Sequence, residues 1–198
     1  LFETLSAGGV NVDLIIQSIH EGNSNDITFT VAEAELSKAR ELCKGLLQTL
    51  GGQLSADVNM TKLSISGAGI MGRPGIAASL FKTLSQVGIN LRLIATSEVK
   101  VSCVIEKALG GKALRAVSAA FELNDNQLKI NPQVNGINEP EVRGVALDRD
   151  QAQVSVKRVP NRPGTAAALC SALAEAGISL DAIVQSERQH SDGSRDIS

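Results

Sequence analysis

The chain of 198 residues contains no tryptophan, no tyrosine and only four phenylalanines. Proteins that bind single-stranded nucleic acid stack the bases on aromatic rings, and proteins that bind quaternary ammonium groups enclose them with such rings. The composition therefore argues against both kinds of site. Strong charge is lacking as well, because charged residues make up 20% of the chain and the formal net charge is −2. Such a surface has no strong field to attract nucleic acid or acidic lipid.

Cysteine and histidine are scarce. The three cysteines, Cys43, Cys103 and Cys170, are an odd number without the spacing of a metal site. Cys103 and Cys170 fall in apolar segments, so we expect buried, reduced thiols, no metal, and an intracellular, reducing compartment. His20 and His190 fall in predicted turns and are interpreted as surface residues, not catalytic ones. No apolar run approaches the roughly 20 residues that cross a membrane.

An internal repeat organises the rest of the sequence. The first landmark is Leu-Phe-Glu-Thr-Leu at 1–5, which returns as Leu-Phe-Lys-Thr-Leu at 80–84 and Leu-Cys-Ser-Ala-Leu at 169–173. The second is Gly-Val-Asn at 9–11, which returns as Gly-Ile-Asn at 88–90 and Gly-Ile-Ser at 177–179. The two landmarks shift together, by 79 residues from the first copy to the second and by 89 residues from the second to the third. Matching intervals at two landmarks indicate a repeated structural unit.

The second copy predicts the full order strand, Pro-Gly turn, helix, Gly-ended turn, strand, hairpin, strand, helix, strand, and the first and third copies predict parts of it. The expected elements of the first unit are a helix from residue 1, strands 11–18 and 26–31, helix 33–50 and strand 53–58. Those of the second are strand 61–66, helix 75–87, strands 90–96 and 100–105, helix 112–121 and strand 128–131. Those of the third, after residues 142–147, are strand 153–159, helix 165–176, strand 179–186 and a strand beginning at 195. This βαββαβ order predicts an α+β, ferredoxin-like fold, an antiparallel sheet with both helices on one face.

The repeat divides the chain into a first unit (1–58, without its first strand), a second unit (59–131), a linker (132–141) and a third unit (142–198, truncated at its C-terminal end). The sequence has no initiator methionine, Leu1 falls inside a predicted helix and Ser198 inside a predicted strand. We therefore expect a piece of a longer protein.

The three units are not equivalent. The first has Asn-Val-Asp-Leu-Ile-Ile-Gln-Ser at 11–18 and the third has Ser-Leu-Asp-Ala-Ile-Val-Gln-Ser at 179–186, whereas the second has Arg92 in place of Asp13 and Asp181. This A-B-A pattern predicts a fourth, B-like unit beyond Ser198. Edge-to-edge pairing of an A unit with a B unit would pack their helices side by side, and we expect it to bring the two helix-start turns close together.

Paired units could bind a small zwitterion. The first N–H groups of a helix suit a carboxylate, Asp13 or Asp181 could accept a hydrogen bond from an ammonium, and Gln17 or Gln185 could bind a polar side chain. The alternative is that both aspartates are solvated residues or local hydrogen-bond acceptors. Glycines at 67, 69 and 72 also spell a dinucleotide-binding fingerprint. We interpret them as a turn, because the predicted helix begins too late and the third unit lacks these glycines.

Several motifs together resemble ACT domains, and more closely the regulatory region of aspartate kinase, in the form with four tandem ACT units. They are Arg-Pro-Gly at 73–75 and 162–164, Gly-Val-Asn at 9–11, Val-Asp-Leu-Ile-Ile-Gln-Ser at 12–18, Asp-Ile-Thr-Phe-Thr at 26–30, Ser-Ile-Ser-Gly-Ala-Gly-Ile-Met at 64–71, Leu-Ile-Ala-Thr-Ser-Glu at 93–98 and Val-Arg-Gly-Val-Ala-Leu-Asp at 142–148. The resemblance covers nearly the whole chain outside the linker.

The resemblance implies that lysine, threonine or both bind between paired ACT units and inhibit, by feedback, the ATP-dependent phosphorylation of aspartate, the first step toward lysine, threonine and methionine. It implies an N-terminal kinase domain that uses ATP and Mg²⁺. None of that domain's glycine-rich or lysine motifs occurs here, so we expect a regulatory piece without catalytic residues or a cofactor of its own. It also implies a homodimer through ACT units, in the cytoplasm, or in the plastid of a photosynthetic eukaryote.

By position, the resemblance assigns effector contacts in all three units. They are Asp13 and Gln17 in the first unit, Met71, Gly75, Asn90, Leu91 and Ser97 in the second, and Asn161, Gly164, Ala166, Asp181 and Gln185 in the third. Two alternatives remain open. One is the amino-acid-sensing ACT region of another enzyme, and the other is a sensor module without catalysis.

Overall fold

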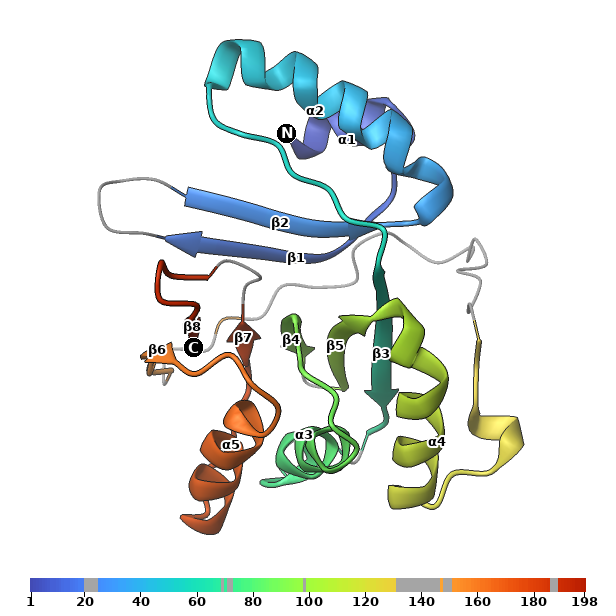
Figure 1. The fold of residues 1–198 in the computed structure, drawn as a ribbon, viewed down its shortest axis with the longest axis vertical. Coiled ribbons are helices and arrows are strands. Elements are labelled where there is room, and N and C mark those ends of the chain that lie inside the picture. Colours follow the sequence, from blue (N-terminus) through green and yellow to red (C-terminus); the bar gives the residue numbers. More distant parts are fainter. Residues whose placement is uncertain are drawn as a thin grey trace.

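The computed structural model describes residues 1–19, 25–68, 70, 73–97, 99–130, 147, 151–185 and 189–198. The first unit comprises α1 (Phe2–Ala7), β1 (Val12–Ile19), β2 (Asn25–Val31), a 3₁₀ turn (Glu33–Glu35) and α2 (Leu36–Leu50). The second comprises β3 (Met60–Ser66), α3 (Ile76–Gln86), β4 (Leu93–Ser97), β5 (Lys100–Glu106), α4 (Gly110–Ala120) and 3₁₀ turns at Lys107–Leu109 and Asp125–Gln127. The third comprises β6 (Val156–Val159), α5 (Thr165–Glu175), β7 (Val184–Gln185) and β8 (Arg195–Ile197) (Figure 1).

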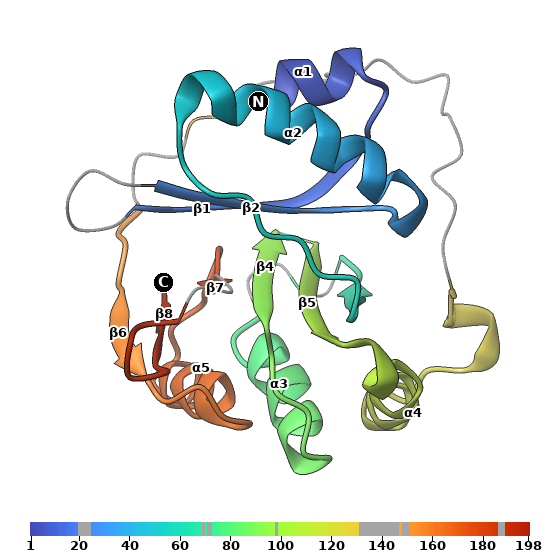
Figure 2. The same cartoon turned by 45° about the horizontal axis from the view of Figure 1, so that its top comes forward.

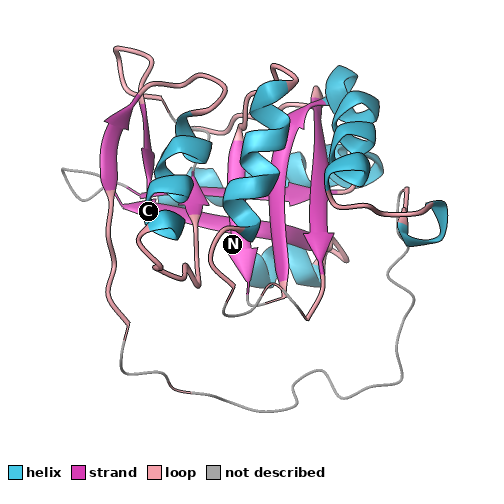
Figure 3. Ribbon diagram, turned by 90° about the horizontal axis from the view of Figure 1, so that it is seen from below, coloured by secondary structure: helices cyan, strands magenta, loops and turns pink. Residues whose placement is uncertain are grey.

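The second and third units share one six-stranded sheet. Its strand order is β3-β5-β4-β7-β8-β6, and every neighbouring pair is antiparallel. The two units join where β4 pairs with β7, with Ile94 opposite Gln185 and Ala95 opposite Val184. Helices α3, α4 and α5 lie on one face of this sheet (Figure 3). The structure confirms an α+β fold with antiparallel sheets and helices on one face, and it shows the expected edge-to-edge pairing of a B unit with an A unit.

Helices α3 and α5 pack side by side but run in opposite directions. A Cβ atom at Gly75, before α3, would lie 3.8 Å from Ala174 Cβ, near the end of α5. A Cβ atom at Gly164, before α5, would lie 2.9 Å from Ser85 Oγ, near the end of α3. The prediction that the two helix-start turns lie close together is therefore wrong. Antiparallel pairing of β4 with β7 reverses one unit relative to the other, so each turn lies beside the far end of the opposite helix.

The first unit covers the helix-free face of the six-stranded sheet. Its two-stranded sheet crosses the larger sheet on that face, and α1 and α2 lie on the side of the small sheet that points away from the larger one (Figures 2 and 3). A small core of its own contains Leu5 and Cys43. Ile16 of β1 instead packs against Leu93 and Val104 of the second unit, and all three side chains are almost completely buried. Burial of such apolar groups holds the first unit on the sheet.

Two predicted strands do not form. Residues 53–58 carry no regular structure, and Asp57 there accepts a hydrogen bond from the amide of Asn59 (2.7 Å), which turns the chain toward β3. Residues 128–130 are not a strand either, because the preceding 3₁₀ turn is closed by a reciprocal cap between Asn124 and Gln127, and Ile130 beyond it is exposed. The predicted strand 153–159 is shorter than expected and starts at Val156.

The fold also shows whether the glycines at 67, 69 and 72 belong to a dinucleotide-binding unit. A dinucleotide-binding unit would pair β3 directly with β4 as parallel neighbours. In the structure β5 lies between them and is antiparallel to both. Among the described helices, none is long and apolar enough to cross a membrane.

Candidate effector sites

Two hollows lie where the second and third units meet. Hollow 1 encloses about 340 Å³, including space open to solvent, and lies between the turn before α5 and the start of the second unit's second strand. Hollow 2 encloses about 430 Å³ and lies between the turn before α3 and the segment that leads into β7 of the third unit, residues 178–183. Six predicted contacts line hollow 1, namely Asn90, Leu91, Asn161, Gly164, Ala166 and Gln185. Three line hollow 2, namely Gly75, Ser97 and Asp181.

The internal repeat explains why there are two hollows. Residues at matching positions of the two units exchange places between them: Leu91 lines hollow 1 and Leu180 lines hollow 2, and likewise Gln185 lines hollow 1 and Thr96 lines hollow 2. Each hollow thus takes its helix-start turn and nearby strand residues from one unit, and the segment that follows the helix, such as Asn90 and Leu91 in hollow 1, from the other. A ligand in either one would contact both units at once.

The helix-start turns have the geometry that an anion requires. Gly75 and Gly164 both adopt left-handed backbone conformations, with φ of 97° and 96°. Only glycine adopts this conformation without strain, which explains its presence before each helix. No described side chain caps the first amides of α3 or α5. Helix-start amides without a side-chain cap, together with the helix dipole of about half a positive charge, suit a carboxylate.

Polar side chains tie the two units together across hollow 1. Asn90 donates from Nδ2 to Asn161 Oδ1 at 2.9 Å. The buried Gln185 donates from Nε2 to the Leu91 carbonyl at 3.0 Å. Arg195, also buried, donates from Nη1 to the carbonyls of Leu91 (3.2 Å) and Arg92 (2.7 Å).

Sequence reasoning missed Arg195. It lies on β8 and lines hollow 1. The repeat aligns it with Asn25 in the first unit, so no shared residue type marked its position. A charged residue inside a predicted strand was the only available signal.

Hollow 2 has different chemistry. Asp181 is exposed at its edge and accepts a hydrogen bond from Gln151 Nε2 at 2.8 Å. Thr96 Oγ1 accepts the amide of Ile183 at 2.7 Å and so fixes this part of the third unit against β4. Cys170 lines hollow 2 where its repeat partner Phe81 lines hollow 1. Burial raises the pKa of the Cys170 thiol to about 11, so it stays protonated at neutral pH.

The structure does not bring the remaining predicted contacts to either hollow. Asp13 forms an ion pair with Lys62 of β3 and accepts the amide of Leu14 at 2.9 Å. Gln17 is exposed on β1, and Met71 lies outside the described residues. The hypothesis that Asp13 is only a local hydrogen-bond acceptor is therefore incomplete, since it also joins the first unit to the second.

Asp181 and Gln185 also line different hollows. Neither hollow is lined by both residues, so a small amino acid bound in one hollow contacts only one of them. The sequence alone predicted that Asp181 and Gln185 contact the same effector.

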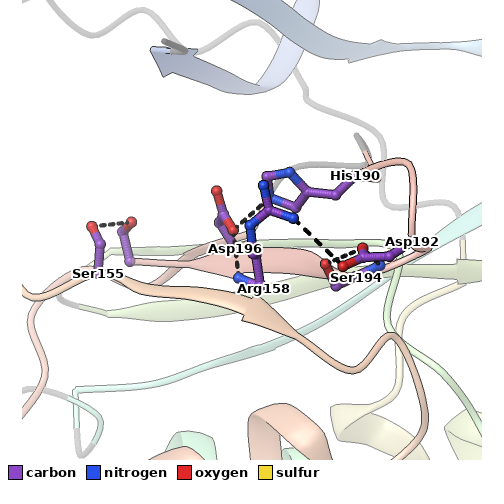
Figure 4. A network of polar contacts seen from close by, with 7 residues as sticks. Ser155, Arg158, His190, Asp192, Ser194 and Asp196 are labelled. Atoms are coloured by element: carbon purple, nitrogen blue, oxygen red, sulfur yellow. Dashed lines mark hydrogen bonds and ion pairs between the residues drawn. The ribbon is translucent and has the colours of Figure 1, made fainter.

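A separate polar network fixes the hairpin around β8 (Figure 4). His190 Nε2 lies 2.8 Å from Asp196 Oδ1, which also accepts the backbone amide of Arg158 at 2.9 Å. Asp192 accepts hydrogen bonds from the amide (2.9 Å) and hydroxyl (2.5 Å) of Ser194 and pairs with the Arg158 guanidinium at 3.5 Å. His190 is thus not a simple surface residue, because its half-buried ring is held by a carboxylate. His20 lies outside the described residues.

All three cysteines are free and buried, as the sequence predicted. Burial raises the pKa of each thiol, to about 12 for Cys103. None of them is therefore activated as a nucleophile.

Comparison with known families identifies the two paired units. Models of the ACT domain match residues 63–121 and residues 152–198. The chain therefore contains two ACT domains and belongs to the ACT-domain proteins.

The relatives are more specific. The chain is 38% identical over 121 residues to the aspartate kinase Ask_LysC of Stutzerimonas stutzeri, an alignment that covers 61% of this chain and 29% of that protein. It is 34% identical over 132 residues to an aspartokinase of Bacillus sp. (strain MGA3), covering 65% of this chain and 32% of the relative. The chain thus spans about three tenths of the length of these relatives.

Solved structures agree with this assignment. The aspartate kinase from Synechocystis superposes with a TM-score of 0.86 at 46% identity, covering 99% of this chain and 34% of that one. The ligand-free regulatory subunit of aspartate kinase from Thermus thermophilus superposes with a TM-score of 0.57 at 34% identity, covering 61% of this chain and 80% of that one. The resemblance to the regulatory region of aspartokinases is confirmed. The fourth unit stays a prediction.

Proposed function

We propose that this chain is the regulatory region of an aspartate kinase, and that lysine, threonine or both bind in hollows 1 and 2 and inhibit the phosphorylation of aspartate by feedback. The ATP and Mg²⁺ for that reaction would belong to a kinase domain outside this sequence. The observation that carries the proposal is the pair of repeat-related hollows, each with a helix start that has no side-chain cap from one ACT unit and a polar side chain, Asn90 or Asp181, from the other.

The two-unit construction of each hollow supports a regulatory role. A ligand that contacts two units favours the arrangement in which both sets of contacts are made, and only this difference in affinity can shift an equilibrium between states. Moving a population from 1:99 to 99:1 requires about 5.5 kcal/mol of differential affinity. Two amino acids bound per chain could supply that energy jointly.

We also propose that the protein forms a homodimer through its ACT units and resides in the cytoplasm. Within the described residues, β1 pairs only with β2, so its outer edge presents unpaired backbone groups. Such an edge is a ready template for another strand. A homodimer with two-fold symmetry is the commonest closed assembly, and it could pair this edge of β1 with a second copy of the chain.

Calorimetric titration of this chain with lysine and threonine, singly and together, tests the proposal. Gln185→Met removes a polar group of hollow 1 at constant side-chain length, and Asp181→Asn removes the charge at hollow 2. Gln17→Met is the matched control, because Gln17 occupies the same repeat position as Gln185 but is exposed on β1.

We expect saturable binding that one hollow variant weakens at least about tenfold, equivalent to about 1.4 kcal/mol, while Gln17→Met leaves it unchanged. Loss of binding in the Gln17 variant would place the effector on the first unit instead. A folded chain that binds neither amino acid would remove both as effectors.

A further inference from the structure

Residues 90–93 form a short segment that touches three parts of the molecule. Asn90 and Leu91 line hollow 1. The side chain of Arg92 bonds to the connector between α2 and β3, that is, residues 51–59. Leu93 begins β4 and packs against Ile16 of the first unit. A displacement that begins in hollow 1 would therefore reach the first unit within three residues.

The contact with the connector is specific. Arg92 Nη2 lies 2.6 Å from Asp57 Oδ2, and Nη1 donates to the Asn59 carbonyl at 3.2 Å. The second oxygen of Asp57 accepts the amide of Asn59 at 2.7 Å, so the connector is folded around the same carboxylate. The Asn59 amide and then the Arg92 guanidinium hold the pKa of Asp57 below its usual value.

The main chain of the same segment is held from hollow 1. The Leu91 carbonyl accepts Gln185 Nε2, and the Arg92 carbonyl accepts Arg195 Nη1. Gln185 is 6% exposed, so its amide has little access to water and must bond to protein or to a ligand. A polar ligand in hollow 1 would compete with Leu91 for this amide.

We propose that Arg92 is a positioning residue that couples hollow 1 to the placement of the first unit. In one arrangement Gln185 holds the Leu91 carbonyl, and Arg92 holds the connector through Asp57. In the other, Gln185 bonds to a ligand, segment 90–93 keeps its main-chain bonds to Arg195 and Val104 but can shift, and the contacts of Arg92 with the connector and of Leu93 with Ile16 weaken. The ligand step rests on the proposed function, while the coupling through Arg92 concerns this chain alone.

The two hollows differ in this respect. The repeat position of Arg92 in the third unit is Asp181, which bonds to Gln151 and not to the connector of the first unit. Within the described residues, the ion pair with the connector is made by Arg92 beside hollow 1 and not by Asp181, its repeat counterpart at hollow 2.

Hydrogen exchange of the β1 and β2 amides tests the coupling without any ligand. Gln185→Met should speed their exchange at least about threefold, because it removes the shorter of the two side-chain hydrogen bonds that hold the Leu91 carbonyl. In an Asp57→Asn background, which keeps the connector's backbone hydrogen bond but removes the ion pair, the same substitution should add almost nothing. Arg92→Met should abolish the coupling, and Arg92→Lys, which keeps a charge opposite Asp57, should retain part of it.

Glu33→Gln is the matched control. Glu33 forms an ion pair of the same length, 2.6 Å, between the first unit and Lys107, but it does not touch residues 90–93. The Gln185 effect should persist in this background. Equal Gln185 effects in the Asp57 and Glu33 backgrounds, or no effect on β1 at all, would overturn the proposal. Because no ligand is added, these outcomes are independent of whether lysine or threonine binds.

Discussion

The side-chain amide of Gln185 donates a hydrogen bond to the main-chain carbonyl of Leu91, 3.0 Å away in the neighbouring ACT unit. This bond joins the two units at the point where they form hollow 1. It also occupies the polar group that sequence reasoning had assigned to an effector. A ligand that takes the N–H now bonded to Leu91 would break this link between the units, so binding and unit–unit packing meet at one side chain.

Alanine at Gly164 should destabilise the protein more than alanine at Gly75. Both glycines have a left-handed backbone, and a non-glycine residue there is strained by about 1 kcal/mol or more. The Gly164 substitution adds a collision with Ser85 Oγ at 2.9 Å, whereas the Gly75 substitution meets Ala174 at an ordinary 3.8 Å. Urea denaturation followed by circular dichroism measures the difference. Adding Ser85→Ala should bring the stability loss of Gly164→Ala close to that of Gly75→Ala. An unchanged difference between the two losses would show that the collision with Ser85 is not its cause.

Truncation of Ile16 should loosen the first unit, while truncation of its neighbour Ile15 should not. Ile16 is 2% exposed against Leu93 and Val104, and Ile15 is 51% exposed. Ile16→Ala should lower the free energy of unfolding by about 2–5 kcal/mol, and Ile15→Ala by less than 1 kcal/mol. Thermal denaturation of both variants provides the comparison. Similar losses at both positions would contradict the orientation of β1.

The cysteines should resist alkylation in the native protein. Burial raises the pKa of Cys103 to about 12 and that of Cys170 to about 11. At pH 8 the thiolate fractions are then on the order of 10⁻⁴ and 10⁻³, and only the thiolate reacts. Mass spectrometry after iodoacetamide treatment should show little labelling at either residue, with Cys170 ahead of Cys103, and complete labelling in urea. Fast native labelling of Cys103 would refute its burial.

The same thiols predict a loss of stability at alkaline pH. In the unfolded chain they ionise around their ordinary pKa of 9.0, whereas in the folded chain they remain protonated at higher pH. The free energy of unfolding should therefore fall as the pH rises above 9. Cys170→Ala should flatten this alkaline decline, which denaturation at pH 8 and pH 10 can measure.

Asp196 should stabilise the folded state fully above its ordinary pKa of 3.8 and lose this contribution as the pH falls through its lowered pKa in the folded state. Partial burial opposes its ionisation, but the Arg158 amide and His190 more than compensate and lower its pKa. A carboxyl group with a lowered folded-state pKa stabilises the folded state above its unfolded-state pKa, and the stabilisation is lost as the pH falls. The melting temperature should drop between pH 6 and pH 3, less so in Asp196→Asn than in the parent. Asp125→Asn, at an exposed position, is the control and should keep the full drop.

Local patterns were sufficient for most of the fold. The repeat of Pro-Gly turns predicted where α3 and α5 begin, because only glycine tolerates the backbone found at Gly75 and Gly164. Apolar periodicity predicted α2, α3 and α4 to within a few residues. The strand expected at 53–58 failed because Asp57 bonds to Asn59 and Arg92, and the second of these partners is distant in sequence.

The candidate site was predictable in part. The turn and strand motifs led to nine residues that line the two hollows. They could not assign those residues to one hollow or the other, because that depends on the antiparallel packing of α3 against α5. They also placed Asp13 with the effector contacts, whereas in the structure its carboxylate pairs with Lys62 of another unit.

The sequence by itself determined the ACT units, their order and their local geometry, since these depend on residues close together along the chain. The tertiary structure decided which units share a sheet, which residues meet in each hollow, and which charges hold the first unit in place. Those outcomes depend on contacts such as Arg92 with Asp57 and Gln185 with Leu91. Their partners lie tens of residues apart, and only the folded chain brings them together.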